Sequence, residues 1–232
     1  MEEVRCEAVC SSSFVLVLIL EGKCLCWRAK PAHLVRHLPG PSEVFHHAGY
    51  SRRDLHKILF GRDTPENHPF LVKTVSQAGV PLKASNGLRL APDYSFEQAP
   101  AFDIVVIPGA NLGVIAQVLT QEEIIQWIAR SSSHSQLMTS VCTGAFLLAQ
   151  AGLLNGKRAT THWAALDQFE QQFPQIQVQR TGKFVDEGPI MTAAALTAGF
   201  HMALHVVERL LGEQMAQAVA KGIDMEGLKP RE

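Results

Sequence analysis

The sequence of 232 residues has no long hydrophobic run and no excess of charge of either sign. Its longest apolar run, residues 14–20, is far shorter than the roughly 20 residues that a membrane-spanning helix needs. Acidic residues precede that run, so it also lacks the positive flank of a signal peptide. The formal net charge of −1 gives no general attraction to nucleic acid or acidic lipid. We therefore expect a cytoplasmic protein whose partners include neither a membrane nor nucleic acid.

Cysteine is scarce and unevenly placed. There are five cysteines, an odd number, and all but Cys142 lie within residues 6–26. A secreted disulfide framework would spread its cysteines along the chain, and the spacing at residues 6–26 fits no common zinc motif. We therefore expect free thiols, no metal and no cofactor.

From about residue 69 onward, β-branched runs alternate with amphipathic stretches, which is the pattern of βαβ units and a mainly parallel sheet. Asn86-Gly87 is a strong turn signal and predicts a hairpin over 82–94. The sequence predicts strands at 14–20, 70–76, 103–107 and 137–141, and helices at 112–119, 121–130, 144–153, 163–173 and 197–211.

The N-terminal part has a different character. Residues 23–68 are rich in histidine and basic residues and show little periodicity, so we expect a divergent loop there. The chain is then an atypical segment, 1–68, with its first strand at 14–20, followed by a core at 69–232. We expect the two to form a single domain.

The clearest chemical signal is the segment SVCTGAFLLAQAGLL, in which a β-type run ends at Val141 and Cys142 follows. A glycine and good helix formers come next, so the order is strand, cysteine, tight turn and helix. A side chain at such a turn projects above the carboxyl edge of a sheet, beside the amides that open the helix. A thiol there ionises more easily, while the Thr143 amide can hold an oxyanion and its hydroxyl can bond a thiolate. The alternative is that Cys142 is a small buried core residue.

A second signal is FDIVVIPGA, a strand that runs into a Pro-Gly turn. If this strand neighbours the one ending at Val141, the amides of Gly109 and Ala110 lie across from Cys142 and complete a small anion pocket. The alternative is an ordinary loop between a strand and a helix.

These segments, with VDEGPIMTAAALTAGFHMALHVVERLLG after them, resemble the ThiJ/PfpI superfamily over residues 69–212. The similar branch contains isocyanide hydratase and the glutamine amidotransferase-like domain of AraC-type regulators. The resemblance implies a flavodoxin-like three-layer α/β/α sandwich with a mainly parallel sheet, a homodimer, and Cys142 as a reactive thiol. Peptidase-type members have histidine after the cysteine, whereas Thr143 stands here, as in the hydratase.

The chain departs from this branch at the acid that serves the cysteine. In the branch, an acidic residue lies shortly before a Gly-Pro; here the segment HLPGPSEVF keeps the Gly-Pro, but His37 occupies the acidic position. His37 could act as the base, or it could have no role. Glu43 could be a buried acid near Cys142 or a helix cap. His162, in TTHW, is a further candidate base or a packing residue, and His201 and His205 have the spacing of a metal pair without an evident third ligand.

The first functional hypothesis is a hydratase or hydrolase that acts on a small electrophilic substrate and uses Cys142 as its nucleophile. The second is a non-catalytic ligand-sensing or redox domain, and the third is a deglycase or glyoxalase with Glu43 as the partner acid. The residues after Gly212 leave no room for a DNA-binding helix pair, so we do not expect an AraC-type regulator.

Overall fold

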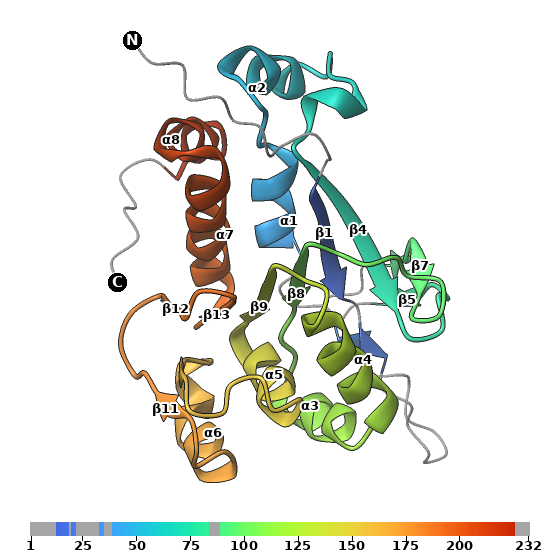
Figure 1. Cartoon of the computed structure of the whole chain (residues 1–232), viewed down its shortest axis with the longest axis vertical. Helices are drawn as coiled ribbons and strands as arrows, with labels where there is room; N and C mark the ends of the chain where they lie inside the picture. Colours follow the sequence, from blue (N-terminus) through green and yellow to red (C-terminus); the bar gives the residue numbers. More distant parts are fainter. Residues whose placement is uncertain (1–12, 19, 22–32, 35–38, 84–88, 226–232) are drawn as a thin grey trace.

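The computed structural model describes residues 13–18, 20–21, 33–34, 39–83 and 89–225. Within these residues, seven strands form the main sheet: β1 (Ser13–Leu18), β4 (Phe70–Ser76), β7 (Tyr94–Ser95), β8 (Ile104–Ile107), β9 (Leu137–Val141), β12 (Phe184–Asp186) and β13 (Ile190–Ala193). Their order across the sheet is β12-β13-β9-β8-β1-β4-β7 (Figure 1). The pairs are parallel except β12 with β13, which is antiparallel.

The central strands β8 and β9 are buried along their whole length. Their sequences, IVVI and LMTSV, show no apolar-polar alternation, because helices cover both faces of a parallel sheet. The predicted strands at 14–20, 70–76, 103–107 and 137–141 are thereby confirmed, with ends that differ by up to two residues.

Helices form a layer on each side of the sheet. They are α1 (Pro39–His46), α2 (Arg52–Leu59), α3 (Leu112–Leu119), α4 (Glu122–Ser132), α5 (Ala145–Gln150), α6 (Leu166–Gln172), α7 (Leu196–Leu211) and α8 (Glu213–Gly222), with 3-10 turns η1 (Pro65–Asn67), η2 (Cys142–Gly144) and η3 (Trp163–Ala165). One hydrophobic cluster joins the sheet to α3, α4, α5 and α6, and a second joins it to α1, α7 and α8. The architecture is therefore the predicted flavodoxin-like α/β sandwich.

Three further strand pairs lie outside the main sheet: β2 (Leu20–Glu21) with β3 (His33–Leu34), β5 (Leu82–Lys83) with β6 (Arg89–Leu90), and β10 (Arg158–Ala159) with β11 (Gln177–Val178). The antiparallel pairing of β5 with β6 confirms the predicted hairpin, whose tip lies outside the described residues.

Several helices differ from the sequence prediction. Part of the expected loop at 23–68 consists of α1 and α2, and α1 packs against α7 in the second hydrophobic cluster. The predicted helix at 144–153 is shorter, because a 3-10 turn precedes it and Gly152, with a φ of 77°, follows it. No helix in the described part of the chain is both long enough and apolar enough to cross a membrane.

Candidate active site

Cys142 lies at the point where β9 ends and the helical segment begins. It follows the last residue of the strand and opens η2, which continues into α5 at Ala145. Its φ is 59°, in the left-handed region that costs a residue with a side chain about 1–2 kcal/mol. The predicted order of strand, cysteine, tight turn and helix is confirmed. The side chain is only 4% exposed.

Two glycines allow the loops to meet at this elbow. A methyl group on Gly144 would lie 2.3 Å from the carbonyl oxygen of Ile107, the last residue of β8. A methyl group on Gly109 would lie 2.9 Å from the Cβ of Cys142 and 2.9 Å from the amide nitrogen of Thr143. Because β8 and β9 pair in parallel, the turn after β8 lies beside Cys142, as the sequence predicted.

Thr143 ties the two loops together. Its hydroxyl donates to the carbonyl oxygen of Ala110 at 2.7 Å and accepts from the amide of the same residue at 2.8 Å. The Ala110 amide, which was expected to lie across from Cys142 as an anion donor, instead donates to the Thr143 hydroxyl. This hydroxyl is likewise committed to the backbone of Ala110.

The TTHW segment contacts the elbow through a residue that sequence reasoning missed. The hydroxyl of Thr161 donates to the carbonyl oxygen of Cys142 at 2.9 Å, and both residues are buried. The neighbouring amide, that of Thr160, donates to the hydroxyl of Thr192 on β13 at 2.9 Å. The TTHW motif itself is the sequence signal for this contact, which involves its threonines and not His162.

Glu43 is not the buried acid that the sequence suggested. Its side chain is 56% exposed, and its carboxylate lies 3.7 Å from Nδ1 of His47, one turn further along α1. The helix buries Val44, Phe45 and Ala48 against the sheet and α7. The 3.6-residue period therefore places Glu43 on the outward face. Glu43 is also not a helix cap, because α1 begins at Pro39.

The two candidate histidines have different outcomes. Nδ1 of His162 accepts a hydrogen bond from the amide of Ala164 at 3.3 Å, so this side chain caps η3. Trp163, beside it, is 77% exposed. His37 lies outside the described residues.

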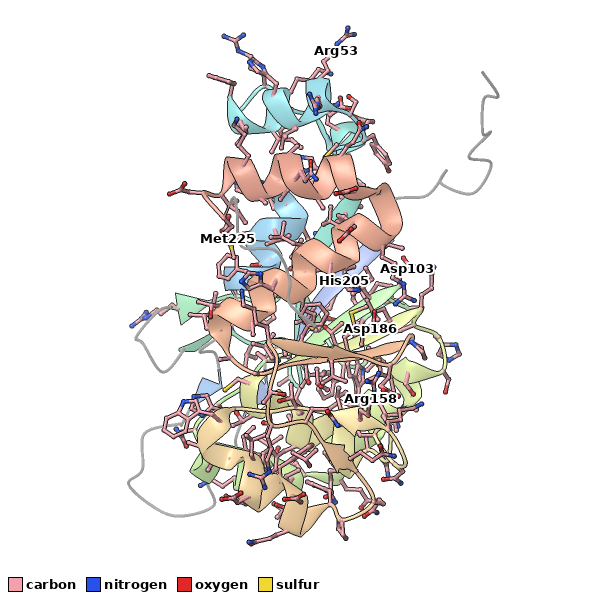
Figure 2. The ribbon with its side chains drawn as sticks, turned by 90° about the vertical axis from the view of Figure 1, so that its left-hand side faces the viewer. Arg53, Asp103, Arg158, Asp186, His205 and Met225 are labelled. Atoms are coloured by element: carbon pink, nitrogen blue, oxygen red, sulfur yellow. The ribbon has the colours of Figure 1, made fainter. Side chains whose placement is uncertain are left out.

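His201 and His205 have different partners. Nε2 of His201 lies 2.7 Å from Nζ of Lys183, whereas Nε2 of His205 lies 2.9 Å from a carboxylate oxygen of Asp186. Figure 2 shows His205 and Asp186 on the same side of the molecule. Among the residues that the structure describes, no group of three or more His, Cys, Asp or Glu side chains is arranged to hold a metal ion.

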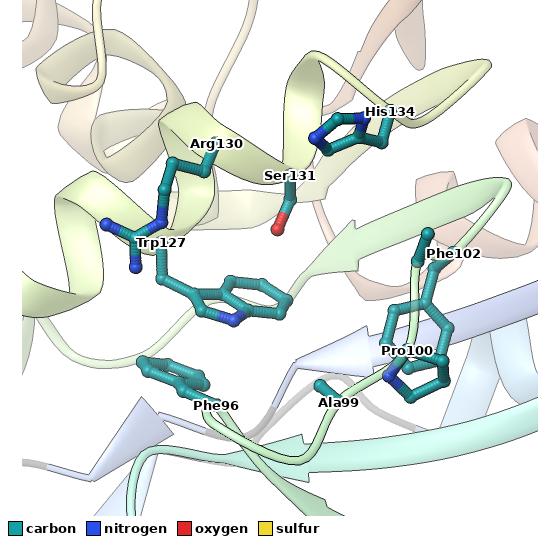
Figure 3. Close-up of a pocket in the computed structure, with 9 residues that line it drawn as sticks. Phe96, Ala99, Pro100, Phe102, Trp127, Arg130, Ser131 and His134 are labelled. Atoms are coloured by element: carbon teal, nitrogen blue, oxygen red, sulfur yellow. The ribbon is translucent and has the colours of Figure 1, made fainter.

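A hollow of about 260 Å³ lies at the amino ends of the sheet strands, whereas Cys142 lies at their carboxyl ends (Figure 3). It lies next to the residues that precede β8 and β9, at the amino ends of these strands, and we call it the amino-edge hollow. The rings of Phe96 and Trp127 stack in it with centroids 4.6 Å apart. Its lining consists of Phe96, Ala99, Pro100, Ala101, Phe102, Trp127, Arg130, Ser131 and His134.

A comparison against protein families assigns the chain to a family. The model described as "DJ-1/PfpI family" matches residues 63–209, and the chain belongs to this family. That family is the ThiJ/PfpI group which the sequence resembles.

Individual relatives have different functions. The chain is 35% identical over 141 residues to the isonitrile hydratase of Pseudomonas putida, covering 60% of this chain and 59% of that protein. It is 31% identical over 160 residues to the HTH-type transcriptional regulator CdhR of Pseudomonas aeruginosa, covering 68% of this chain and 46% of the regulator. The chain thus spans less than two thirds of each relative. A crystal structure of a ThiJ/PfpI family protein from Pseudomonas syringae has a TM-score of 0.72 at 22% identity, covering 96% of this chain and 78% of that one, and shares its fold.

Proposed function

We propose that the protein is a cysteine-dependent enzyme that hydrates or hydrolyses a small electrophilic substrate, with Cys142 as the nucleophile. The observation that carries the proposal is the backbone of Cys142, a residue with a side chain held at a φ of 59° between a buried strand and a helical turn. Strained residues of this kind persist where the surroundings hold them, and they are concentrated at functional sites. The similarity to isonitrile hydratase supports the same reaction class.

An isonitrile substrate would react through a covalent intermediate on Cys142. The Cys142 thiolate forms a bond from sulfur to the terminal carbon, and that carbon takes up a proton to give a thioimidate. Water then adds across the carbon–nitrogen double bond, with its oxygen on the carbon and one proton on the nitrogen. The sulfur–carbon bond breaks as the hydroxyl proton passes to the sulfur. The products are an N-substituted formamide and the free thiol.

In this reaction, backbone amides stabilise the negative charge that develops on the substrate. We assign the developing negative charge to the amides of Gly109 and Thr143, because the amide of Ala110 is bonded to the Thr143 hydroxyl. The proposed reaction also needs a base that activates water. Because Glu43 is exposed and His162 caps its own turn, we take His37 as the candidate base.

The exposure of Glu43 favours a second candidate function. An enzyme needs a group in place of the family acid, whereas a ligand-sensing or redox domain needs only the pocket or the thiol. The similarity to the regulator CdhR supports this alternative. A deglycase or glyoxalase has less support, because Glu43, the acid it would need beside the cysteine, is exposed.

The association of two chains into a homodimer remains a prediction.

The pH dependence of Cys142 alkylation tests the first proposal. Iodoacetamide labelling is followed by mass spectrometry of the Cys142 peptide, with Cys142→Ser as the control. We expect half-maximal labelling well below the free-thiol value of about 8.5, because helix-opening amides favour the thiolate. We also expect turnover of an alkyl isonitrile to its formamide, which is lost in Cys142→Ser.

Other outcomes separate the hypotheses. A low midpoint without turnover of isonitriles or methylglyoxal supports the redox or sensing domain. An ordinary midpoint without turnover contradicts a nucleophilic role for Cys142. Comparing His37→Ala with Glu43→Ala then identifies a base, since only the variant that lacks it loses turnover while Cys142 is still labelled.

A further inference from the structure

The carbonyl group of Cys142 accepts hydrogen bonds from two different parts of the chain. One comes from the amide of Ala145, within the helical turn that Cys142 opens. The other comes from the hydroxyl of Thr161, 2.9 Å away, which reaches the elbow from a segment between β10 and η3. Thr161 is 1% exposed, so water does not compete for this bond.

A second donor matters at this position because the backbone of Cys142 is strained. A left-handed φ persists only where surrounding contacts determine it, since a residue with a side chain otherwise relaxes toward negative φ. The carbonyl oxygen belongs to the peptide group between Cys142 and Thr143, so its position shows how that group is oriented. A donor fixed on this oxygen therefore fixes where the thiol projects.

Thr161 can act as such a fixed donor because its own segment is anchored to the sheet. The amide of Thr160 donates to the hydroxyl of Thr192 at 2.9 Å. Thr192 lies on β13, and its register partner on β9 is Ser140, two residues before Cys142. The connections thus run from β9 to β13, across to Thr160 and Thr161, and back to the carbonyl of Cys142.

We propose that Thr161 is a positioning residue that holds the Cys142 elbow in its reactive conformation. It acts through the carbonyl of Cys142 and not on the thiol. The proposal rests on the proposed function of Cys142 as a nucleophile. It assigns a role to the second threonine of TTHW, next to the histidine that caps η3.

The test compares three variants of the full chain by the pH profile of Cys142 alkylation. Thr161→Val removes the hydroxyl at nearly constant volume, and Thr161→Ser retains it. Thr139→Val is the matched control, because the Thr139 hydroxyl donates to the carbonyl oxygen of Val105 at 3.0 Å and is equally buried, but bonds β8 and not the elbow. Melting temperatures are measured alongside.

We expect Thr161→Val to slow alkylation at pH 7 about tenfold, the change in population that strain of this kind produces, and to move the midpoint toward that of a free thiol. Thr161→Ser should restore the wild-type profile, and Thr139→Val should lower the melting temperature while keeping that profile. A wild-type profile in Thr161→Val overturns the inference. So does an equal change in Thr139→Val, which would indicate a general loss of stability.

A further variant decides the matter should Thr161→Val fail to fold. Thr192→Val removes the acceptor of the Thr160 amide and leaves Thr161 intact, so it should shift the alkylation midpoint in the same direction by a smaller amount. An unchanged profile would overturn the inference. A wild-type midpoint near 8.5 would instead contradict the proposed function of Cys142, which distinguishes the two failures.

Discussion

At the carboxyl edge of the sheet, three segments meet around Cys142 so closely that two glycines leave no space for a methyl group. At the amino edge, the aromatic rings of Phe96 and Trp127 border an open hollow of about 260 Å³. An apolar hollow with a few polar groups is a common first hypothesis for a functional site. The left-handed backbone of Cys142 lies instead at the carboxyl edge. Cys142, with its left-handed backbone, thus lies where the loop contacts are tight and not beside the amino-edge hollow.

At the carboxyl edge, Gly144→Ala should lower the stability of the protein more than any other substitution considered. Its new methyl group would lie 2.3 Å from the carbonyl oxygen of Ile107, so the strand or the helix has to move. We expect a loss of about 3 kcal/mol or more in the free energy of unfolding, measured in urea. Gly113→Ala is the control, since its methyl group meets only the Asn111 side chain at 3.4 Å and should cost little. Similar losses in both variants would contradict the tight packing.

Thr143→Val should have the next largest effect, because it leaves the amide and the carbonyl of buried Ala110 without their partner. A lost buried hydrogen bond of this kind costs about 1–3 kcal/mol. Thr143→Ser retains the hydroxyl and should recover most of the stability. A Val variant as stable as the Ser variant would show that the tie between the loops contributes nothing.

Ala99→Leu tests the amino edge, where Ala99 lines the hollow. The added carbons would extend into the amino-edge hollow, so we expect a change within about 1 kcal/mol in stability. Cys142 alkylation should keep its wild-type pH profile, because the hollow lies at the opposite ends of β8 and β9. An altered profile would mean that the two edges are coupled through the sheet.

The smallest effect concerns histidines near the amino end of β4. The ring of His46 stacks on His68 with centroids 5.0 Å apart, and His68 bonds the Asp63 carboxylate at 2.7 Å. Partial burial, followed by the charges of His68 and His47, lowers the pKa of His46 below 6.5. The hydrogen bond from His68 lowers the pKa of Asp63 below 3.8, so Asp63 stays ionised above pH 5.

Because the folded pKa of His46 lies below the unfolded one, its contribution is complete above pH 6.5 and is lost as the pH falls through the folded pKa. Between pH 7.5 and 5.5, wild type should therefore lose more stability than His46→Gln, as measured by urea unfolding at each pH. Equal losses in the two proteins would refute this contribution, and Cys142 alkylation should not respond to the substitution.

Much of the fold could be predicted because its signals are local. The runs IVVI and LMTSV specify buried parallel strands, and Val-Cys-Thr-Gly specifies the elbow. The helices α1 and α2 were missed because each is short and stands in a segment rich in His, Gly and Pro. The outward position of Glu43 was nevertheless available from the spacing of Val44, Phe45 and Ala48.

The contacts that complete the candidate site were not available from sequence. The Thr143 hydroxyl reaches Ala110 only because β8 and β9 pair in one particular register. Thr161 bonds a backbone carbonyl, and every residue has one, so no residue pattern reveals that contact. Side-chain identity indicated which residue could react, whereas strand register determines which residues support it.

The place of β1 in the sheet has a consequence for how the chain assembles. β1 is the first described strand, yet it lies between β8 and β4 and pairs with both. The family match at residues 63–209 does not include it. A fragment restricted to those residues would leave two parallel strands with facing unpaired edges, a template for association with other chains. Because β4 and β8 both follow β1 in the chain, β1 cannot complete its pairing until both neighbours have been synthesised, and the sheet then closes around it.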